Sequence, residues 1–358
     1  MLAPVTFLAP LITIRRTRLL PIPGEVTVRK GQTVRPTEVV ASARLAPQHY
    51  LLNVARSLGI TEEQTEQYIE RFLGNEVHKD DIIATRGKIG KRIVRAPVDG
   101  TIVFVAGGQV LIRLNTAATE LKAGYPGTVA ELIHERGVII SATGSLIQAL
   151  WGNGKINAGP LNVLASTPDH ELGPSDLTES MKGAVALAGT CNQANALKAG
   201  AEVKLRGLIL ASLAPELLPL ASAAPYPILV TEGFGKLPFN PVAYKLLSSN
   251  QKRTVTVNAE PFDRTNDTRP EIFIGVETSN LGESEIPPAA ALLAPDQKVR
   301  ITRAPHQGKI GVLTALLPGL TIFPNGLRAS AARIQFEKDN PAQMSEVVVP
   351  LANLEILF

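Results

Sequence analysis

Three polar side chains follow apolar, strand-like runs in the middle of the chain, and their types could support binding or covalent chemistry. Cys191 follows the run GAVALAG, Ser212 ends the run LRGLILAS, and Glu232 lies within YPILVTEGFG. When such strands are parallel, ligands gather at their carboxyl ends, where helix N-termini present free N–H groups. A thiol at a helix start has a lowered pKa and can act as a nucleophile. The sequence therefore predicts a ligand site at these residues, with a small buried thiol as the alternative for Cys191.

Basic side chains are concentrated in two other segments, where they could contact phosphate groups or an acidic partner. The segment near the C-terminus opposes its basic residues with Asp296 alone. The segment in the first third is an expected hairpin, for which a solvated surface without a partner is the alternative. The predicted contact residues are Lys298, Arg300, Arg303, His306 and Lys309 in the C-terminal segment, and Arg86, Lys88, Lys91 and Arg92 in the hairpin.

Other arrangements that carry chemistry are not found in the sequence. The five histidines are dispersed without the spacing of metal ligands, and the glycine-bearing segments lack the spacing of phosphate-binding or dinucleotide-binding loops. We find no catalytic constellation, and we predict no metal and no cofactor. The chain is expected to be non-catalytic, although an enzyme built on the middle segment stays an alternative.

The composition indicates the cellular location of the protein and the classes of partner that it can have. The formal net charge of +4 over 358 residues does not by itself indicate nucleic acid, and the single cysteine excludes an internal disulfide framework. No stretch is apolar for about 18 consecutive residues, which is what a membrane span needs. The arginines of the N-terminal segment follow its apolar run, which makes it a poor secretory signal. These features predict a cytoplasmic protein without a membrane partner.

The front of the chain is predicted to be rich in β-strands. Three similar segments that begin at Pro23, Ala96 and Pro126 each combine a glycine-containing turn with Val/Ile-rich alternation, which is typical of antiparallel hairpins. Residues 47–73 interrupt them with two stretches of helical spacing, with Gly59 at a C-cap position and Thr61 with Gln64 as a capping box. We therefore expect residues 1–160 to form a β domain with a helical insertion at 47–73.

The middle of the chain has a different period. Each of the three apolar runs is followed by a helix-like segment, NQANALKAG, APELLPLAS or NPVAYKLLSSN, which predicts parallel βαβ packing. Two further strands, TVTVNAEP and EIFIGVET, complete a small α/β domain over residues 161–284. The Ala/Pro-rich residues 285–296 are expected to be a linker to a final domain over residues 297–358. The predicted fold class is thus a mixed, β-rich multidomain protein.

The last 60 or so residues resemble a KOW motif. The resemblance rests on KVRITRAPHQGKIGVLTAL, in which a strand leads through the loop HQGKIG into a second strand, and on the closing strand VVVPLANLEIL. The KOW family comprises ribosomal proteins and NusG-type transcription factors. The resemblance implies an SH3-like β-barrel that contacts RNA, ribosome or RNA polymerase.

The front segment resembles a barrel-sandwich hybrid, the fold of biotinyl and lipoyl carriers. The matching residues are VRKGQTVRPTEVVA, and GNEVHKDDIIATRG followed by RAPVDGTIV. The hairpin that presents the modified lysine in carriers is ATRGKIGKRIV here, and it lacks the Met-Lys-Met or Asp-Lys-Ala motif. The resemblance therefore implies the fold and not the carrier chemistry.

Three functions follow from these observations. The first is a non-catalytic binding protein associated with nucleic acid or a nucleoprotein complex of transcription or translation. The second is a protein-interaction scaffold without nucleic acid, and the third is a small-ligand-binding protein or enzyme that uses the α/β segment. The third requires a concave pocket that joins Cys191 or Glu232 to a second polar group.

Overall fold

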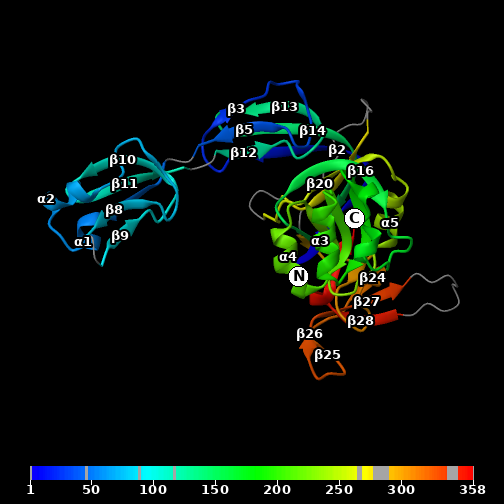
Figure 1. The fold of residues 1–358 in the computed structure, drawn as a ribbon. Coiled ribbons are helices and arrows are strands. Elements are labelled where there is room, and N and C mark those ends of the chain that lie inside the picture. The colour runs from blue at the N-terminus through cyan, green and yellow to red at the C-terminus, as the bar shows by residue number, and fades with distance from the viewer. Residues whose placement is uncertain are drawn as a thin grey trace.

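The computed structural model describes residues 2–44, 47–87, 90–115, 118–263, 268–276, 290–336 and 346–357. Strands predominate, and they form several sheets, as expected for a β-rich multidomain protein. Figure 1 shows four groups of elements, with a small body of strands and short helices at one end and the C-terminal strands at the other.

A run of parallel strands forms the centre of the molecule, and it confirms the predicted βαβ alternation. The four parallel strands are neighbours in chain order, and two of them are buried along their whole length. Such burial on both faces explains their continuous apolar runs. These strands are β16 (Ile156–Val163), β17 (Val185–Cys191), β18 (Gly207–Leu213) and β19 (Ile228–Phe234), and β15 (Trp151–Gly152) pairs with β19.

Helices cover both faces of these parallel strands. Two helices and a 3-10 turn pack on one face, and a third helix packs on the other. The first face is covered by α3 (Ala194–Glu202), η4 (Pro215–Leu217) and α4 (Leu218–Ala223), and the second by α5 (Pro241–Ser248). Two short turns, η2 (Pro174–Asp176) and η3 (Glu179–Met181), precede β17.

The same sheet continues into the front of the chain through antiparallel strands. Its order after β16 is β20 (Thr254–Asn258), β21 (Glu271–Gly275), β14 (Gly137–Gln148), β13 (Gly127–Ile133) and β4 (Thr33–Val34), while β2 (Leu8–Leu19) pairs along β14. Because β14 pairs with β21, hydrogen bonding crosses the boundary that the sequence placed at residue 160. A separate sheet of β3 (Glu25–Val26), β5 (Val39–Ala43) and β12 (Thr119–Lys122) accompanies β13 and β14.

Residues 47–115 form a body with a hydrophobic core of its own, which includes Val54, Leu58 and Ile83. The predicted helical hairpin is wrong in its first part, because His49–Asn53 is a strand that pairs with a neighbouring strand instead of a helix. Gly59 ends the helix with φ 66°, as predicted, but Thr61 makes no side-chain cap hydrogen bond. The elements are β6 (His49–Asn53), α1 (Val54–Leu58), α2 (Glu62–Thr65), η1 (Glu66–Tyr68), β7 (Glu76–Val77), β8 (Ile82–Arg86), β9 (Arg92–Arg95), β10 (Gly100–Ala106) and β11 (Gln109–Leu114).

The C-terminal strands form a sheet with the first strand of the chain. In order, the sheet contains β22 (Ala290–Leu292), β1 (Leu2–Thr6), β29 (Leu354–Leu357), β23 (Lys298–Ile301), β24 (Ile310–Leu316), β27 (Ala331–Phe336) and β28 (Glu346–Pro350). A hairpin of β25 (Thr321–Ile322) and β26 (Arg328–Ala329) projects from it, and η6 (Leu351–Asn353) precedes β29.

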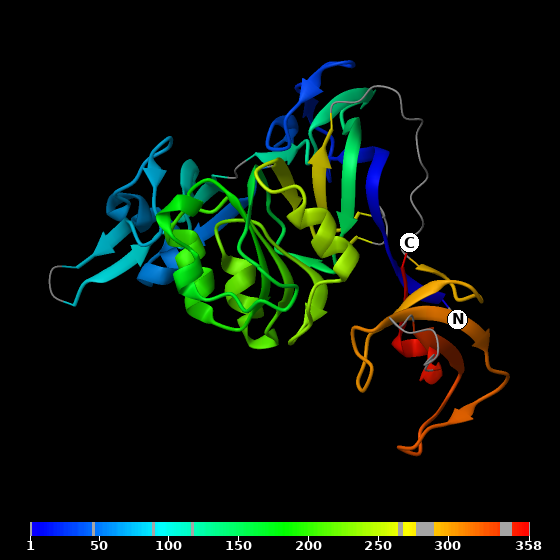
Figure 2. The same ribbon diagram turned by 90° about the vertical axis from the view of Figure 1, so that its right-hand side faces the viewer.

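Two of these placements differ from expectation. The first strand was expected in the front domain, but β1 runs parallel to β29, and Figure 2 shows the two ends of the chain close together there. The expected linker contributes β22, which pairs with β1. Both results depend on pairing between residues that are far apart in the sequence, which periodicity does not reveal.

The placement of β1 makes a prediction about stability. Val5 is 1% exposed in the core of the C-terminal sheet, whereas Leu2 on the same strand is 63% exposed. We expect Val5→Ala to cost about 2 kcal/mol, because it leaves a cavity in that core. Leu2→Ala should change stability by less than about 0.5 kcal/mol. Hydrogen exchange of the β29 amides measures the difference, and equal protection in the two variants would contradict the role of β1.

A buried carboxylate fixes the join between β21 and the front strands. Glu271 is 1% exposed and accepts hydrogen bonds from Arg16, from the Tyr125 hydroxyl at 2.5 Å and from Gln148 Nε2 at 3.2 Å. Burial and the Glu271 charge both raise the pKa of Tyr125, so the phenol stays a donor. Burial tends to lower the pKa of Arg16, but the charges and hydrogen bonds of Glu271 and Tyr125 together outweigh burial and raise it. The carboxylate is thus fully paired, as a buried charge requires.

This pairing predicts unequal effects of two matched substitutions. Glu271→Gln leaves the Arg16 guanidinium without its counter-charge in a buried setting, and we expect it to cost about 3 kcal/mol. Glu131→Gln removes an exposed ion pair, in which the Glu131 side chain is 53% exposed and the Arg15 side chain 35%. This substitution should cost less than about 1 kcal/mol. Urea denaturation followed by circular dichroism compares them. Similar midpoints for both variants would rule out a structural role for the Glu271 cluster.

Candidate functional site

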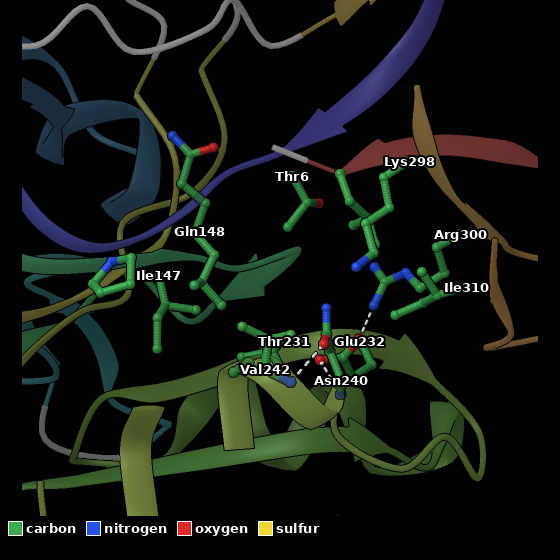
Figure 3. A pocket seen from close by; sticks show the side chains of 14 residues that line it. Thr6, Ile147, Gln148, Thr231, Glu232, Asn240, Val242, Lys298, Arg300 and Ile310 are labelled. Carbon is green, nitrogen blue, oxygen red and sulfur yellow. Dashed lines mark hydrogen bonds and ion pairs between the residues drawn. The ribbon is translucent and has the colours of Figure 1, made fainter. Parts of the chain in front are cut away.

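A pocket lies where the α/β strands meet the C-terminal sheet. Its volume is about 250 Å³, and Figure 3 shows side chains entering it from both sides. Apolar and polar residues line it in equal number, but most of the surface that they expose to the pocket is apolar. The apolar residues are Leu8, Pro10, Ile147, Val242, Ala243, Ile310 and Leu357, and the polar ones are Thr6, Gln148, Thr231, Glu232, Asn240, Lys298 and Arg300.

An ion-pair cluster forms one end of the pocket. The Arg300 guanidinium on β23 pairs with Glu232 at the end of β19 and with Glu355 on β29, the latter at 2.6 Å from Nη2 to Oε2. All three side chains are 7% exposed or less. Thr6 donates its hydroxyl hydrogen to the other Glu355 oxygen. One guanidinium thus joins two carboxylates from different sheets, and the dashed line in Figure 3 marks its pair with Glu232.

The start of α5 holds the second oxygen of Glu232. The backbone N–H of Asn240 donates to Glu232 Oε1 at 3.0 Å, while the Asn240 side chain caps α5 by accepting from the Val242 N–H at 2.9 Å. Pro241 follows at the first helical position, where a missing N–H costs nothing. Because both Glu232 oxygens have partners, this carboxylate is not free to remove a proton from a ligand.

Lys298 supplies the charge that a ligand in the pocket would meet. It lies two positions before Arg300 on β23, and alternate residues of a strand share a face. Lys298 is exposed, and its ammonium group has no ion pair or hydrogen bond to the residues that the structure describes. Since Arg300 is engaged by two carboxylates, Lys298 is the available cation at this pocket.

A second cavity lies on the other side of the ion pair. Its volume is about 270 Å³, and Glu232, Asn240 and Arg300 line it as well as the first pocket. Its remaining lining comes from Pro168, from the segment after β19, and from the end of β23 with the loop that follows it. The Glu232–Arg300 pair is therefore a shared wall between two cavities.

The structure does not bring the three predicted strand-end residues into one site. Cys191 is 1% exposed, and burial raises the pKa of its thiol to about 11, which fits the small buried thiol and not an activated nucleophile. Ser212 is fully buried and accepts a hydrogen bond from the Leu237 N–H at 3.0 Å. The segment after β19 thus covers the end of β18. Glu232 alone among the three reaches the pocket.

The C-terminal basic residues are also divided. Arg300, predicted at a contact surface, lies buried in the ion-pair cluster, which corrects that prediction. Arg303 and Lys309 are exposed, while Lys309 Nζ lies 5.3 Å from the centre of the Phe336 ring and the His306 ring lies 5.7 Å from it. The loop surface therefore presents Arg303, His306 and Lys309, with Lys298 at the pocket.

Two arginines of the basic hairpin stabilise the fold of residues 47–115. Arg86 and Arg92 face each other across β8 and β9, and their guanidinium groups donate to the Leu58 carbonyl at 3.1 and 3.2 Å. Unpaired carbonyls at a helix C-terminus favour such cations, so both residues stabilise the end of α1. Lys91 is exposed, and Lys88 lies outside the described residues.

Sequence reasoning missed three polar residues of the pocket, Thr6, Gln148 and Asn240. The Asn240-Pro241 pair carried a usable signal, because it is typical of a helix start directly after a strand-end segment. Thr6 and Gln148 have no local signal, since they reach the pocket through the pairing of β1 and β14 with distant strands.

No protein-family model matches the chain, and no curated protein matches it. Among the residues described, no group of three or more histidine, cysteine or carboxylate side chains could hold a metal ion. Within the same residues, no helix has the length and apolar character to cross a membrane.

The Cys191 environment predicts low thiol reactivity in the folded protein. With a pKa of about 11, roughly one thiol in a thousand is ionised at about pH 8, and the thiolate is the reactive form. We expect slow reaction with Ellman's reagent in the native state and rapid reaction in urea. Between about pH 8 and pH 9 the native rate should rise about tenfold. A rapid, stoichiometric reaction of the native protein at pH 8 would show that the thiol is activated.

Proposed function

We propose that this chain is a non-catalytic binding protein that holds a small molecule between its α/β strands and its C-terminal sheet. The observation that carries the proposal is the pocket that joins Glu232 to Arg300 and Lys298. Its mostly apolar wall with a few convergent polar groups is typical of ligand sites. A ligand with an apolar body and one anionic group fits this wall best, because Lys298 is the available charge.

The pocket favours binding over catalysis. Neither a histidine nor a cysteine lines it within the described residues, and its one carboxylate is held by Arg300 and the Asn240 N–H. A catalytic site would need a nucleophile or base with a partner that activates or orients it, and Lys298 has no such partner among the described residues. Rigid ion pairing instead suits a site whose walls must keep their shape.

The inferred folds of the C-terminal and front parts of the chain are also those of binding domains. We infer a KOW-type, SH3-like barrel for the C-terminal strands, in which β23 leads through the glycine-containing loop at Gly308 into β24. A barrel-sandwich hybrid is inferred for the front of the chain, residues 1–160, within which residues 47–115 have a core of their own. In this proposal the C-terminal unit forms one wall of the pocket, and the buried Arg300 does not contact an external partner. A buried, unpaired Cys191 agrees with a cytoplasmic location.

A protein-interaction scaffold is the second candidate function. The β25–β26 hairpin exposes Leu320, Ile322 and Leu327 at 65–66% each, and it projects away from the sheet (Figure 2). Apolar side chains grouped on a projecting hairpin favour contact with another protein. This candidate is independent of the pocket, since none of the three leucine and isoleucine residues lines it.

The pocket can be tested with anilinonaphthalene sulfonate, a fluorescent probe with an apolar body and one anionic group. We expect saturable binding of one probe per chain at this site. Val242→Trp should abolish it by filling the pocket, because Val242 lines the wall and is 49% exposed, so the larger side chain can be accommodated. Lys298→Met should weaken it by about tenfold, since a charge-assisted contact contributes about 1.5 kcal/mol.

Two control variants separate the pocket from the rest of the surface. Val348→Trp changes a valine of similar exposure, 43%, that does not line the pocket, and Lys252→Met removes an exposed lysine elsewhere. Both should bind the probe like the unmodified chain. Probe binding that survives Val242→Trp, or that Val348→Trp reduces equally, would reject the pocket as the binding site.

A further inference from the structure

A larger groove crosses one part of the long sheet, away from the pocket. Its volume is about 1350 Å³, and six neighbouring strands contribute to it, namely β16, β20, β21, β14, β13 and β4. Figure 1 shows these strands where the small β unit carrying β13 and β14 meets the α/β unit carrying β16 and β20. Its lining includes the small residues Gly127, Ala142, Ala158, Gly159 and Gly275.

The charges that line the groove have one sign. Arg35 and Arg206 are its charged lining residues, and no aspartate or glutamate lines it among the described residues. Arg35 is exposed and makes no side-chain hydrogen bond or ion pair to the described residues, while Arg206 makes one weak contact, 3.3 Å to the Ala158 carbonyl. Both guanidinium groups thus keep most of their donors free for a ligand.

Hydroxyl groups complete the lining. Thr33, Thr37, Thr128, Ser141 and Thr254 line the groove, and within the described part of the chain their hydroxyls have no hydrogen-bond partner. Arginine guanidinium groups and serine and threonine hydroxyls are the side chains that commonly contact phosphate oxygens in nucleic-acid complexes. Their free donors across several strands suit a chain of repeated anionic groups.

We propose that this groove binds the sugar–phosphate backbone of a nucleic acid. Among the described residues, no carboxylate on the groove lining would repel a phosphate chain, and the small lining residues let the backbone approach closely. No aromatic side chain lines the groove among the described residues, so base stacking does not contribute and the contact is independent of sequence.

The groove is separate from the ligand pocket. The two share no lining residue, although both include part of β14. Their failures can therefore be told apart, because Val242→Trp should leave nucleic-acid binding unchanged and the groove variants should leave probe binding unchanged.

The test uses fluorescence anisotropy of the full chain with a fluorescein-labelled oligo(dT), and with a labelled DNA duplex, each of about 20 nucleotides or base pairs. We expect binding of at least one of them at low salt. The double variant R35A/R206A should bind roughly tenfold or more weakly, and the slope of log affinity against log salt should fall by about 1.4 to 1.8, since two phosphate contacts are lost. Both arginines are exposed, and circular dichroism checks that the variant is folded.

Controls fix the meaning of each outcome. R113A/R328A removes two exposed arginines outside the groove and should bind like the unmodified chain. The proposal is overturned if neither oligonucleotide binds at low salt, or if R35A/R206A binds as well as the control. It is also overturned if R303A/K309A alone weakens binding, which would place the contact on the C-terminal loop. Displacement of the oligonucleotide by poly-glutamate at equal charge concentration would indicate an acidic protein partner and overturn it as well.

Discussion

One guanidinium, that of Arg300, holds the C-terminal sheet against the α/β strands. It lies between Glu232 and Glu355, and all three side chains are almost fully buried. A buried ion pair of this kind adds little net stability, but removal of one partner leaves a buried charge that costs several kcal/mol. The cluster therefore specifies geometry more than it adds energy. It favours one orientation of the two units, and two of its members, Glu232 and Arg300, line both neighbouring cavities.

The path of the chain explains why the pocket draws on distant segments. Strand β1 leaves the C-terminal sheet, where it lies beside β29, and β2 then runs along β14 in the long sheet. Arg269 donates to the Val5 carbonyl and so ties the loop before β21 to β1. Residues 47–115 are inserted between strands of the front half without entering either sheet. The pocket consequently gains Thr6 from the start of the chain and Leu357 from its end.

The sequence was sufficient where structure depends on local pattern and insufficient where it depends on distant partners. Strands β17, β18 and β19 were predictable because burial on both faces requires continuous apolar runs between helix-like segments. The strand β6 was read as a helix because its apolar spacing suits a helix until β11 offers a partner. Arg300 was read as a surface cation because nothing near it in sequence indicates that Glu232 and Glu355 converge on it.

Strand β14 contributes residues to both the groove and the pocket. Ser141–Thr143 line the groove, and Ile147 and Gln148 line the pocket. Coupling between two sites requires an element with two alternative arrangements that both ligands bias. β14 does not fit that requirement, because β2, β13 and β21 pair with it and Gln148 donates to the buried Glu271. A strand held by this many partners keeps one arrangement and does not couple the two sites. Occupancy of the groove and of the pocket should therefore contribute independently to the stability of the folded chain.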